Sequence, residues 1–373
     1  MRHALMGLLL TLASVGEARA VDYRVDYRVD TVASGLVHPW SLAFLPGGRL
    51  LVTERPGRLR VIEPGPNGQM ALRAAPVQGL PPVMARGQAG LFDVLLHPGF
   101  ADNGLLYLSL AHGTPQANHL RVVRARFDGT RLLDVTPVFT SQPAKTASQH
   151  FGGRMAWLPD GTLLLSMGDG NLERTDAQRL NTHLGKLMRI NADGSVPADN
   201  PFLGTPGARP EIYSRGHRNP QGLVVVQGVV YEHEHGARGG DELNRVTPGA
   251  NYGWPLTTGG VDYTYARITP YRNLPGITPP LLEWTPSVAP AGLAWYDGAL
   301  FPAWRGSLFV ATLKERSVRR VAMTGAALAV PAAQEVLFQE LGERLRDVRA
   351  GPDGALYLLT DSPEGRVLRV MPR

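Results

Sequence analysis

The chain contains no cysteine among its 373 residues. The fold therefore uses neither disulfides nor thiolate metal sites, and this absence fits a reducing or an oxidising compartment equally well. Lysine is rare too: of the 38 basic residues, only Lys145, Lys186 and Lys314 are lysines. Because arginine serves almost everywhere else, the position of each lysine calls for an explanation.

Several familiar motifs are also missing. No Gly-x-Gly-x-x-Gly follows a strand-like run and no Walker loop occurs, which disfavours a nucleotide cofactor. No Gly-x-Ser-x-Gly marks a serine hydrolase, and neither a His-Glu-x-x-His motif nor an EF-hand loop is present. The net charge is +6, but the arginines are scattered and no basic run interleaved with aromatic residues indicates nucleic acid. The charge indicates solubility and attraction for an anionic ligand.

The N-terminal region reads as a targeting segment followed by one domain. Residues 1–20 have the pattern of a signal peptide, with a basic start, an apolar core from Ala4 to Val15 and a small-x-small cleavage site at Ala18–Ala20. The apolar core is too short to cross a bilayer, so we expect no membrane span and export to a periplasm or the exterior. Residues 21–30 form a duplicated lead-in, and 31–373 a single domain that functions as a monomer or a homodimer.

One pattern recurs along the domain: an apolar run, a turn rich in Gly, Pro or Asp, and a second apolar run. Six copies occur, with turns at Pro46–Gly48, Pro98, Pro159–Gly161, Gln227–Gly228, Asp297–Gly298 and Gly351–Gly354. Their spacing of about 40 to 70 residues is typical of radial β architectures. Most copies continue into a further apolar strand. We therefore predict an all-β fold, a six-bladed β-propeller with four-stranded antiparallel blades. A β-sandwich, the alternative, has no reason to repeat one motif six times, and Asp176–Leu187 is the only modest helix candidate.

Loops between propeller blades gather at one mouth of the central channel, so residues distant in sequence converge there. His150 stands beside Gly152 and Gly153 and is suited to accept a proton near neutral pH. Asp169 follows an apolar run of the same repeat and can orient the imidazole. A lone histidine is more often structural or exposed, and that alternative stays open.

Three further stretches carry unusual polar residues. Arg218 offers a planar, permanent charge for an oxyanion, although an ion pair with a nearby carboxylate is a common alternative. The stretch Glu232–Glu242 is rich in oxygen ligands, which suits Ca²⁺ better than zinc. Lys314 ends a strand of the fifth repeat, and Arg344 and Arg346 lie on one face of a strand that opens the sixth. Together these cations predict a mouth that binds a polyanionic small ligand.

The motifs His38–Ser41, Arg86–Leu91 and Arg346–Val348, in this order with those above, resemble the soluble pyrroloquinoline-quinone-dependent sugar dehydrogenases, most closely their aldose sugar dehydrogenase branch. The resemblance covers nearly the whole chain after residue 20, and the family's fold is a six-bladed β-propeller. It implies oxidation of the anomeric hydroxyl of aldose sugars to lactones. Pyrroloquinoline quinone (PQQ) and Ca²⁺ are the implied cofactors, and the electron acceptor is unknown.

The resemblance also implies roles for single residues. His150 would be the general base, Asp169 its orienting carboxylate, and Arg218 the stabiliser of charge on the quinone oxygen. Cofactor-binding positions would be Gln88, Arg218, Asn219, Tyr263, Thr312, Leu313, Lys314, Arg344, Leu345 and Arg346. Substrate contacts would be Gln88, His150, Asp169 and Trp284. For Tyr263 and Trp284, ordinary packing is an equal alternative.

For Ca²⁺, the resemblance implies backbone carbonyls at Gly236 and Ala237, and a further site at Asp241, Glu242 and the carbonyl of Tyr252. The family usually has proline where this chain has Ala237. Two other functions stay open: a Ca²⁺-dependent propeller lactonase, and a non-catalytic propeller that binds a glycan or a protein. The lactonase does not account for the set of Gln88, Lys314, Arg344 and Arg346.

Overall fold

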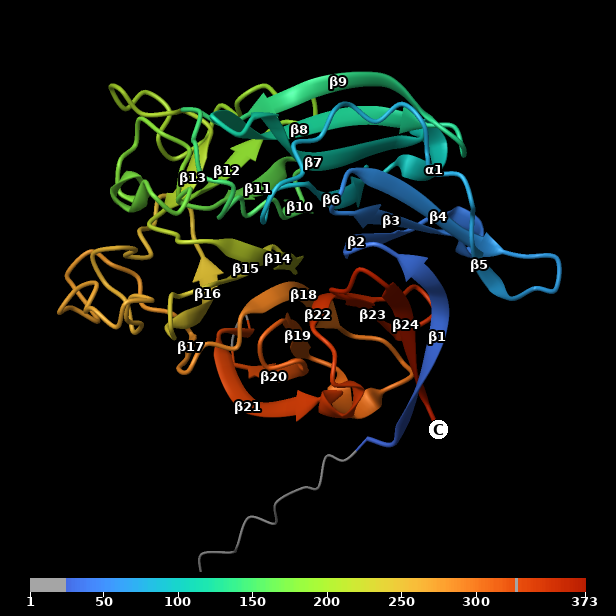
Figure 1. Cartoon of the computed structure of the whole chain (residues 1–373). Coiled ribbons are helices and arrows are strands. Elements are labelled where there is room, and N and C mark those ends of the chain that lie inside the picture. Colours follow the sequence, from blue (N-terminus) through green and yellow to red (C-terminus); the bar gives the residue numbers. More distant parts are fainter. Residues whose placement is uncertain (1–24, 326–327) are drawn as a thin grey trace, which may run out of the picture.

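The computed structural model describes residues 25–325 and 328–373, so the predicted signal peptide lies outside the described part. Six four-stranded sheets surround a central axis as the blades of a propeller (Figure 1). The strands within each sheet pair in antiparallel fashion. The predicted fold class is therefore confirmed.

Each blade is a sheet of four strands, which are ordered from the axis of the propeller to its outer edge. Blades 1 to 3 consist of β2 (Pro39–Phe44), β3 (Leu50–Glu54), β4 (Arg58–Pro64) and β5 (Met70–Leu72); β6 (Leu91–Leu96), β7 (Leu105–Thr114), β8 (Ala117–Phe127) and β9 (Leu132–Thr140); and β10 (Met155–Trp157), β11 (Leu163–Met167), β12 (Lys186–Ile190) and β13 (Ile212–Arg215). Blades 4 and 5 consist of β14 (Pro220–Val226), β15 (Val229–Glu234), β16 (Asp241–Val246) and β17 (Leu282–Trp284); and β18 (Pro290–Tyr296), β19 (Ser307–Thr312), β20 (Val318–Thr324) and β21 (Val330–Leu337).

Blade 6 joins the two ends of the described chain. It contains β22 (Leu345–Ala350), β23 (Leu356–Thr360), β24 (Gly365–Pro372) and, as its outermost strand, β1 (Tyr27–Leu36). The β1–β24 register runs from Tyr27 opposite Pro372 to Leu36 opposite Gly365. Because β1 begins at Tyr27, the last four residues of the predicted lead-in belong to the propeller and close its ring.

The second strand of a blade is the strongest element in the sequence because it is covered on both faces. All five residues of β3 (LLVTE) and of β11 (LLLSM) are buried, and such strands read as continuous apolar runs. Outer strands such as β21 (VPAAQEVL) are largely exposed and carry little apolar signal. Apolar side chains of neighbouring sheets then pack together, and the described residues form one buried cluster at each of the six blade interfaces.

Helices are short throughout the described chain. They are α1 (Phe100–Asn103) and the 3-10 turns Pro46–Gly48, Arg174–Ala177, Pro302–Trp304 and Gln339–Leu341. The modest helix candidate at Asp176–Leu187 is wrong, because Lys186 already begins β12 and Gly185 has a φ of 69°. A β-carbon on Gly185 would come within 2.5 Å of the Ala177 side chain. No helix in the described residues is long and apolar enough to span a membrane.

The topology assigns different roles to the two ends of the channel. The residue before the first strand of a blade and the residue after its second strand lie at the same end, which we call the mouth. The turns between first and second strands lie at the opposite end, which we call the turn end. Blade 4 shows the pattern, since Asn219 precedes β14 and His235 follows β15. Both residues line a cavity at the mouth.

Candidate active site

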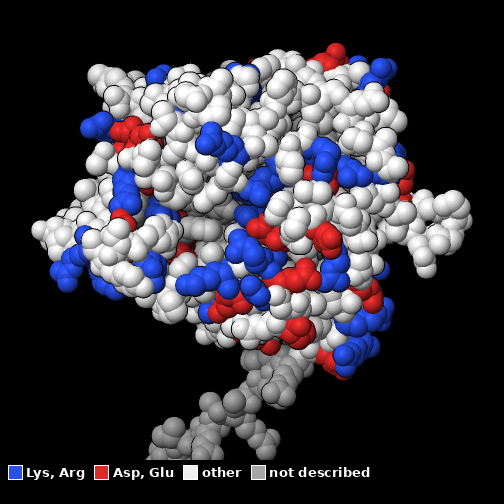
Figure 2. Space-filling model, in the orientation of Figure 1, with Lys and Arg blue, Asp and Glu red and all other residues white. Residues whose placement is uncertain are grey.

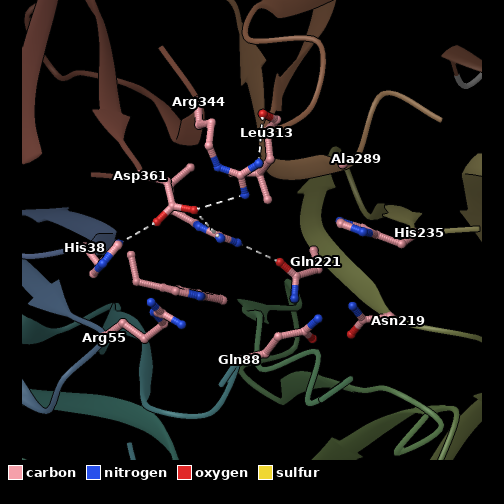
Figure 3. A pocket seen from close by; sticks show the side chains of 12 residues that line it. His38, Arg55, Gln88, Asn219, Gln221, His235, Ala289, Leu313, Arg344 and Asp361 are labelled. Carbon is pink, nitrogen blue, oxygen red and sulfur yellow. Dashed lines mark hydrogen bonds and ion pairs between the residues drawn. The ribbon is translucent and has the colours of Figure 1, made fainter. Parts of the chain in front are cut away.

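A cavity of about 470 Å³ opens at the mouth and draws its walls from five of the six blades. Five predicted cofactor-binding residues line it: Gln88, Asn219, Leu313, Arg344 and Arg346. Sequence reasoning missed the other lining residues, which are His38, Trp40, Arg55, Gln221, His235, Ala289 and Asp361. Figure 3 shows most of these side chains pointing toward one another from separate blades. The predicted convergence of distant loops at the mouth is thus present.

One wall of the cavity is cationic but contains a carboxylate. Asp361 accepts hydrogen bonds from Arg346 Nη2 at 2.9 Å and from Arg344 Nη2 at 3.3 Å, and His38 Nδ1 lies 3.0 Å from its other oxygen (Figure 3). Burial opposes ionisation, but the charges of Arg346 and Arg344 and the His38 contact hold the pKa of Asp361 well below its ordinary value. Asp361 thus stays charged and fixes two guanidinium groups. Arg346 Nη1 also donates to Gln221 Oε1 at 3.0 Å.

His150 and Asp169 form the predicted pair. His150 Nδ1 lies 2.7 Å from Asp169 Oδ1, and both side chains are almost fully buried. Trp254 Nε1 donates to the other oxygen of Asp169 at 2.7 Å, so the carboxylate is held on both sides. His150 has a φ of 51°, and a β-carbon on Gly168 would come within 2.4 Å of the His150 carbonyl. A glycine at position 168 is therefore required for this close approach.

The electrostatics of the pair suit a base. Burial lowers the pKa of His150, the hydrogen bond to Asp169 opposes this shift, and Arg218 adds to it, so the imidazole is neutral near pH 7. Burial raises the pKa of Asp169, but His150 and Arg218 outweigh it and leave the pKa below its ordinary value. Since the carboxylate only accepts, the Nδ1 of His150 carries the proton and Nε2 keeps a lone pair. His150 does not line the cavity itself, but its backbone N–H donates to Gln88 Oε1 at 3.1 Å, and Gln88 does.

Arg218 lies next to this pair, because its carbonyl accepts a hydrogen bond from the Asp169 N–H at 2.8 Å. Its Nη1 donates to the carbonyls of Gly236 at 2.5 Å and His235 at 3.1 Å. The guanidinium carbon lies 5.3 Å from the centre of the Trp254 ring and 5.9 Å from that of Tyr263. Its Nε is buried and has no hydrogen-bond partner among the described residues. One donor of this cation is therefore unused.

The structure does not bring every predicted contact residue to the cavity. Trp284 lies in the outermost strand of blade 4, packs in the interface with blade 5 and donates through Nε1 to Gln334 Oε1 at 2.8 Å. Thr312 is buried and exchanges hydrogen bonds with Ser317, and Leu345 belongs to the core between blades 5 and 6. The side chains of these three residues thus already fill structural roles, and their contacts with a cofactor or a sugar stay predictions. Lys314 is exposed beside Leu313, and Tyr263 is 57% exposed near Arg218.

The predicted metal loop is buried but one assigned ligand is occupied. Gly236 and Ala237 are both buried, and Gly236 N donates to Asp241 Oδ1 at 2.8 Å. Asp241 Oδ2 accepts from the Ser287 hydroxyl and the Val288 N–H, each at 2.7 Å, and from the Ala289 N–H at 2.9 Å. Asp241 therefore ties the loop to the segment that precedes blade 5, and its Oδ1, which accepts one hydrogen bond, keeps a lone pair. Its role as a metal ligand stays a prediction.

A different set of metal-compatible side chains lies beneath Arg218. His217 Nδ1 is 3.4 Å from carboxylate oxygens of both Glu232 and Glu234, and all three residues are buried. Glu234 Oε2 also accepts from the backbone N–H groups of Arg218 and Asn219, which ties their turn to β15. Sequence reasoning missed this cluster, although the alternation Glu232–His233–Glu234 in a strand places both carboxylates on one face.

The charge of this cluster is balanced within the protein. Burial alone lowers the pKa of His217, but the two carboxylates raise it to about 9. Burial, reinforced by the charge of Glu234, raises the pKa of Glu232 to about 7. The predicted ligand Glu242 faces Glu234 across the β15–β16 ladder, and the ring of Tyr252 stacks on His217 at 4.9 Å. Glu242 and Tyr252 thus adjoin the cluster, whereas Asp241 points to blade 5.

Comparisons with known proteins agree on one family. The family model for Glucose / Sorbosone dehydrogenase matches residues 36–369. The chain is 38% identical over 353 residues to "Aldose sugar dehydrogenase YliI" of Escherichia coli, covering 92% of this chain and 93% of that protein. A crystal structure of a glucose dehydrogenase superposes with a TM-score of 0.87 at 43% identity, covering 92% of this chain and 99% of the other. The PQQ-bound form of an aldose sugar dehydrogenase from Streptomyces coelicolor gives 0.74 at 29% identity, covering 93% and 99%. The chain belongs to the glucose/sorbosone dehydrogenase family.

Proposed function

We propose that this protein oxidises the anomeric C1 hydroxyl of aldose sugars to lactones, using PQQ and Ca²⁺. The observation that carries the proposal is the neutral, carboxylate-held His150 at the edge of a cationic cavity. Family membership and the PQQ-bound relative support the same chemistry.

The cavity residues fit a flat polyanion such as the tricarboxylate PQQ. Arg55, Arg344 and Arg346 supply permanent positive charge, and Gln88 and Asn219 supply amide groups. The buried Nε atoms of Arg55 and Arg218 have no partner in the described chain, so donors remain for a ligand. When bound, PQQ supplies the two-electron acceptor that the protein's own side chains lack.

Ca²⁺ would be held by the carbonyls of Gly236 and Ala237, where it supplies a Lewis acid. The Gly236 carbonyl accepts one hydrogen bond from Arg218 and keeps a second lone pair. The loop does not depend on proline for its shape. Asp241 holds Gly236, Arg238 N donates to the Val261 carbonyl at 3.1 Å, and Gly240 N donates to Thr285 Oγ1 at 2.9 Å.

A second cation, if bound, would meet the His217, Glu232 and Glu234 cluster, with Glu242 beside it. Two buried atoms there, Glu232 Oε2 and His217 Nδ1, have no hydrogen-bond partner in the described chain. The protonated imidazole already offsets one carboxylate charge. We therefore propose that this cluster mainly fixes the Arg218–Asn219 turn, and that a cation there adds to its rigidity.

The chain's own residues account for the proton. The C1 hydroxyl loses its proton to His150 Nε2 as the C1–H bonding pair leaves as hydride and the C1–O double bond of the lactone forms. Asp169 stabilises the resulting imidazolium, and Trp254 keeps the carboxylate in place. The fixed charge of Arg218 would stabilise negative charge on the bound two-electron acceptor.

Reconstitution tests the proposal directly. Purified apoprotein is mixed with PQQ and Ca²⁺, and bleaching of an artificial electron acceptor is followed with several aldoses. We expect sugar-dependent bleaching that requires both additions. No bleaching with any aldose would refute the proposal. Lactone hydrolysis without quinone would favour the lactonase, and glycan binding without a spectral change would favour the non-catalytic propeller.

We also propose that the protein is exported after removal of residues 1–20, and that its electrons pass to an external acceptor. The signal pattern at positions 1–20 supports this localisation. Sequencing the N-terminus of protein from the periplasmic fraction should begin at Val21. An intact N-terminus in the cytoplasmic fraction would contradict export.

A further inference from the structure

One of the rare lysines is buried next to the His150 loop. Lys145 is 2% exposed, and its backbone exchanges two 2.9 Å hydrogen bonds with Asn118 at the edge of blade 2. Its ammonium donates to two carbonyls further along the chain, those of Ala147 and Gln149, the latter at 3.0 Å. It also lies 3.5 Å from the centre of the Phe151 ring. A single cation therefore grips the segment on both sides of His150.

That segment holds an uncommon backbone conformation. His150 adopts a φ of 51°, which is uncommon for a residue with a side chain. From other segments, the Gln88 side chain accepts from the His150 N–H, the Gln88 N–H donates to the Ser148 carbonyl at 3.2 Å, and Asp169 contacts the His150 ring. Phe151 packs against Phe92. The Lys145 ammonium adds a tie from the segment's own side, through two carbonyls that precede His150.

Lys145 also packs against the turn that carries Asp169. A β-carbon on Gly170 would come within 3.0 Å of Lys145 Cδ and 2.8 Å of Glu173 Oε2. The side chain of Lys145 thus passes directly beside the residue after Asp169. Since His150 and Asp169 belong to separate segments, a side chain that touches both segments fixes their spacing.

We infer that Lys145 is a positioning residue for the His150–Asp169 pair: it holds the two segments together and brings a positive charge close to the imidazole. This inference rests on the proposed function only for the role of His150 in turnover. The arrangement of the two segments and the effect on the imidazole are properties of the apoprotein.

The charges around the two groups favour this role. Burial is the largest cause that lowers the pKa of His150. The nearby Asp169 raises this pKa, and the charges of Arg218 and Lys145 lower it further. Lys145 faces Glu173 and Asp169; burial lowers the pKa of Lys145 to about 7, and both carboxylates oppose that shift. In the acidic range where His150 becomes protonated, Lys145 therefore carries its charge. Removing that charge must raise the pKa of His150.

Lys186 provides a matched control. It is also fully buried, donates to two carbonyls, those of Asp176 and Leu184, each at 2.7 Å, and has its pKa lowered by burial to about 7. Unlike Lys145, it is not among the main groups that shift the pKa of His150. A general loss of packing should affect both lysine variants, whereas the positioning role predicts an effect of Lys145 alone.

The experiment compares Lys145→Gln, Lys145→Arg and Lys186→Gln in the full chain. The pKa of His150 is measured by NMR of histidine ring carbons in apoprotein, with the signal assigned through His150→Gln. We expect Lys145→Gln to raise this pKa, and Lys145→Arg, which keeps the charge, to leave it unchanged. In reconstituted enzyme, Lys145→Gln should lower kcat at least tenfold with little change in KM, and shift the acid limb of kcat/KM to higher pH.

An unchanged His150 pKa in Lys145→Gln, or the same shift in Lys186→Gln, would overturn the inference. Circular dichroism verifies folding, and Lys145→Met, whose straight side chain follows the same path, replaces any variant that does not fold. If reconstituted wild-type protein oxidises no aldose, the proposed function fails, but the NMR titration still decides whether Lys145 controls the imidazole.

Discussion

The two ends of the propeller channel differ in what their cavities are made of. The turn end holds the larger space, about 830 Å³, lined by the Pro- and Gly-rich turns of blades 1, 2, 5 and 6. One of its few carboxylates, Asp353, is already paired with Arg369 at 2.6 Å. The mouth cavity is smaller, yet it gathers three arginines, two histidines and an aspartate from separate blades. Convergence of charged groups, and not volume, therefore distinguishes the candidate site.

The largest expected difference concerns the two histidine positions. His150→Asn should lower kcat by about 10³-fold, because a positioned general base contributes on the order of 10² to 10⁴. Cofactor affinity should stay within about threefold, because His150 does not line the cavity. The control is His97→Asn at the turn end, which should leave turnover unchanged. Stopped-flow reduction of the artificial acceptor measures both, and equal losses would remove the distinction between the ends.

The second difference concerns binding of the anionic cofactor. Arg346→Met should weaken PQQ affinity about 10- to 100-fold, since a hydrogen bond to a charged group contributes about 1.5–3 kcal/mol. Arg49→Met, at the turn-end cavity, should leave affinity unchanged. Absorbance titration of apoprotein with PQQ, with and without Ca²⁺, gives the dissociation constants. A loss of PQQ affinity in Arg49→Met would indicate that the cofactor binds at the turn end and not at the mouth.

The third prediction concerns acid stability, which depends on histidines buried on the mouth side of the blades. The ring of His233 is fully buried, its Nε2 lies 3.2 Å from the Gly292 carbonyl, and burial lowers its pKa to about 3. The unfolded chain thus binds more protons below pH 6.5, and stability falls as pH drops from 6.5 toward 3, by up to about 1.4 kcal/mol per pH unit. Urea unfolding at pH 6.5 and 5.0 measures the slope.

The control for this slope is a substitution of His233 that cannot ionise. His233→Gln lowers stability at every pH but should reduce the difference between pH 6.5 and 5.0. His97→Gln, a partly exposed residue at the turn end, should not reduce it. If both variants keep the wild-type difference, the buried histidine of blade 4 does not cause the acid sensitivity.

The smallest effect is expected at Ala237. Ala237→Pro should change Ca²⁺ affinity by less than about threefold, because the loop is already braced by Asp241, by the Arg238 backbone and by Gly240. Calcium titration followed through PQQ-dependent activity measures this. A gain of tenfold or more would show that these braces leave the loop flexible. Treatment with a chelator should abolish the activity of the wild-type protein and of Ala237→Pro.

The fold was predictable because the inner strands of each blade carry an apolar signal strong enough to stand alone. The outer strands β5, β13 and β17 have three or four residues each and no such signal, so the repeat revealed hairpins and third strands but not the full blades. The strand β1 was read in part as a lead-in, because its partner β24 lies more than 300 residues away in sequence. Pairing at that distance leaves no local pattern.

The site was predictable where chemistry and position coincide. His150 stands out because two glycines follow close after it, and Asp169 because glycines flank it near the end of β11; the structure joins the two side chains at 2.7 Å. For Asp241 and Trp284, sequence does not show the contacts that the structure gives them, hydrogen bonds from nearby donors for Asp241 and core packing for Trp284. Asp361 was missed because a lone aspartate after a strand looks like a turn residue until Arg344 and Arg346 are seen around it.

The closure of blade 6 has a consequence for how the protein assembles. Arg346 lies in β22 of the sheet that β1 completes, Arg344 directly precedes β22, and Asp361 directly follows β23. Blades 1 to 5 are contiguous in sequence and can form as the chain emerges, but this sheet needs both termini. The arginine wall is therefore the last part of the ring to mature, and a chain that has lost residues 1–36 would lack a finished binding wall even with every residue that lines the mouth cavity intact.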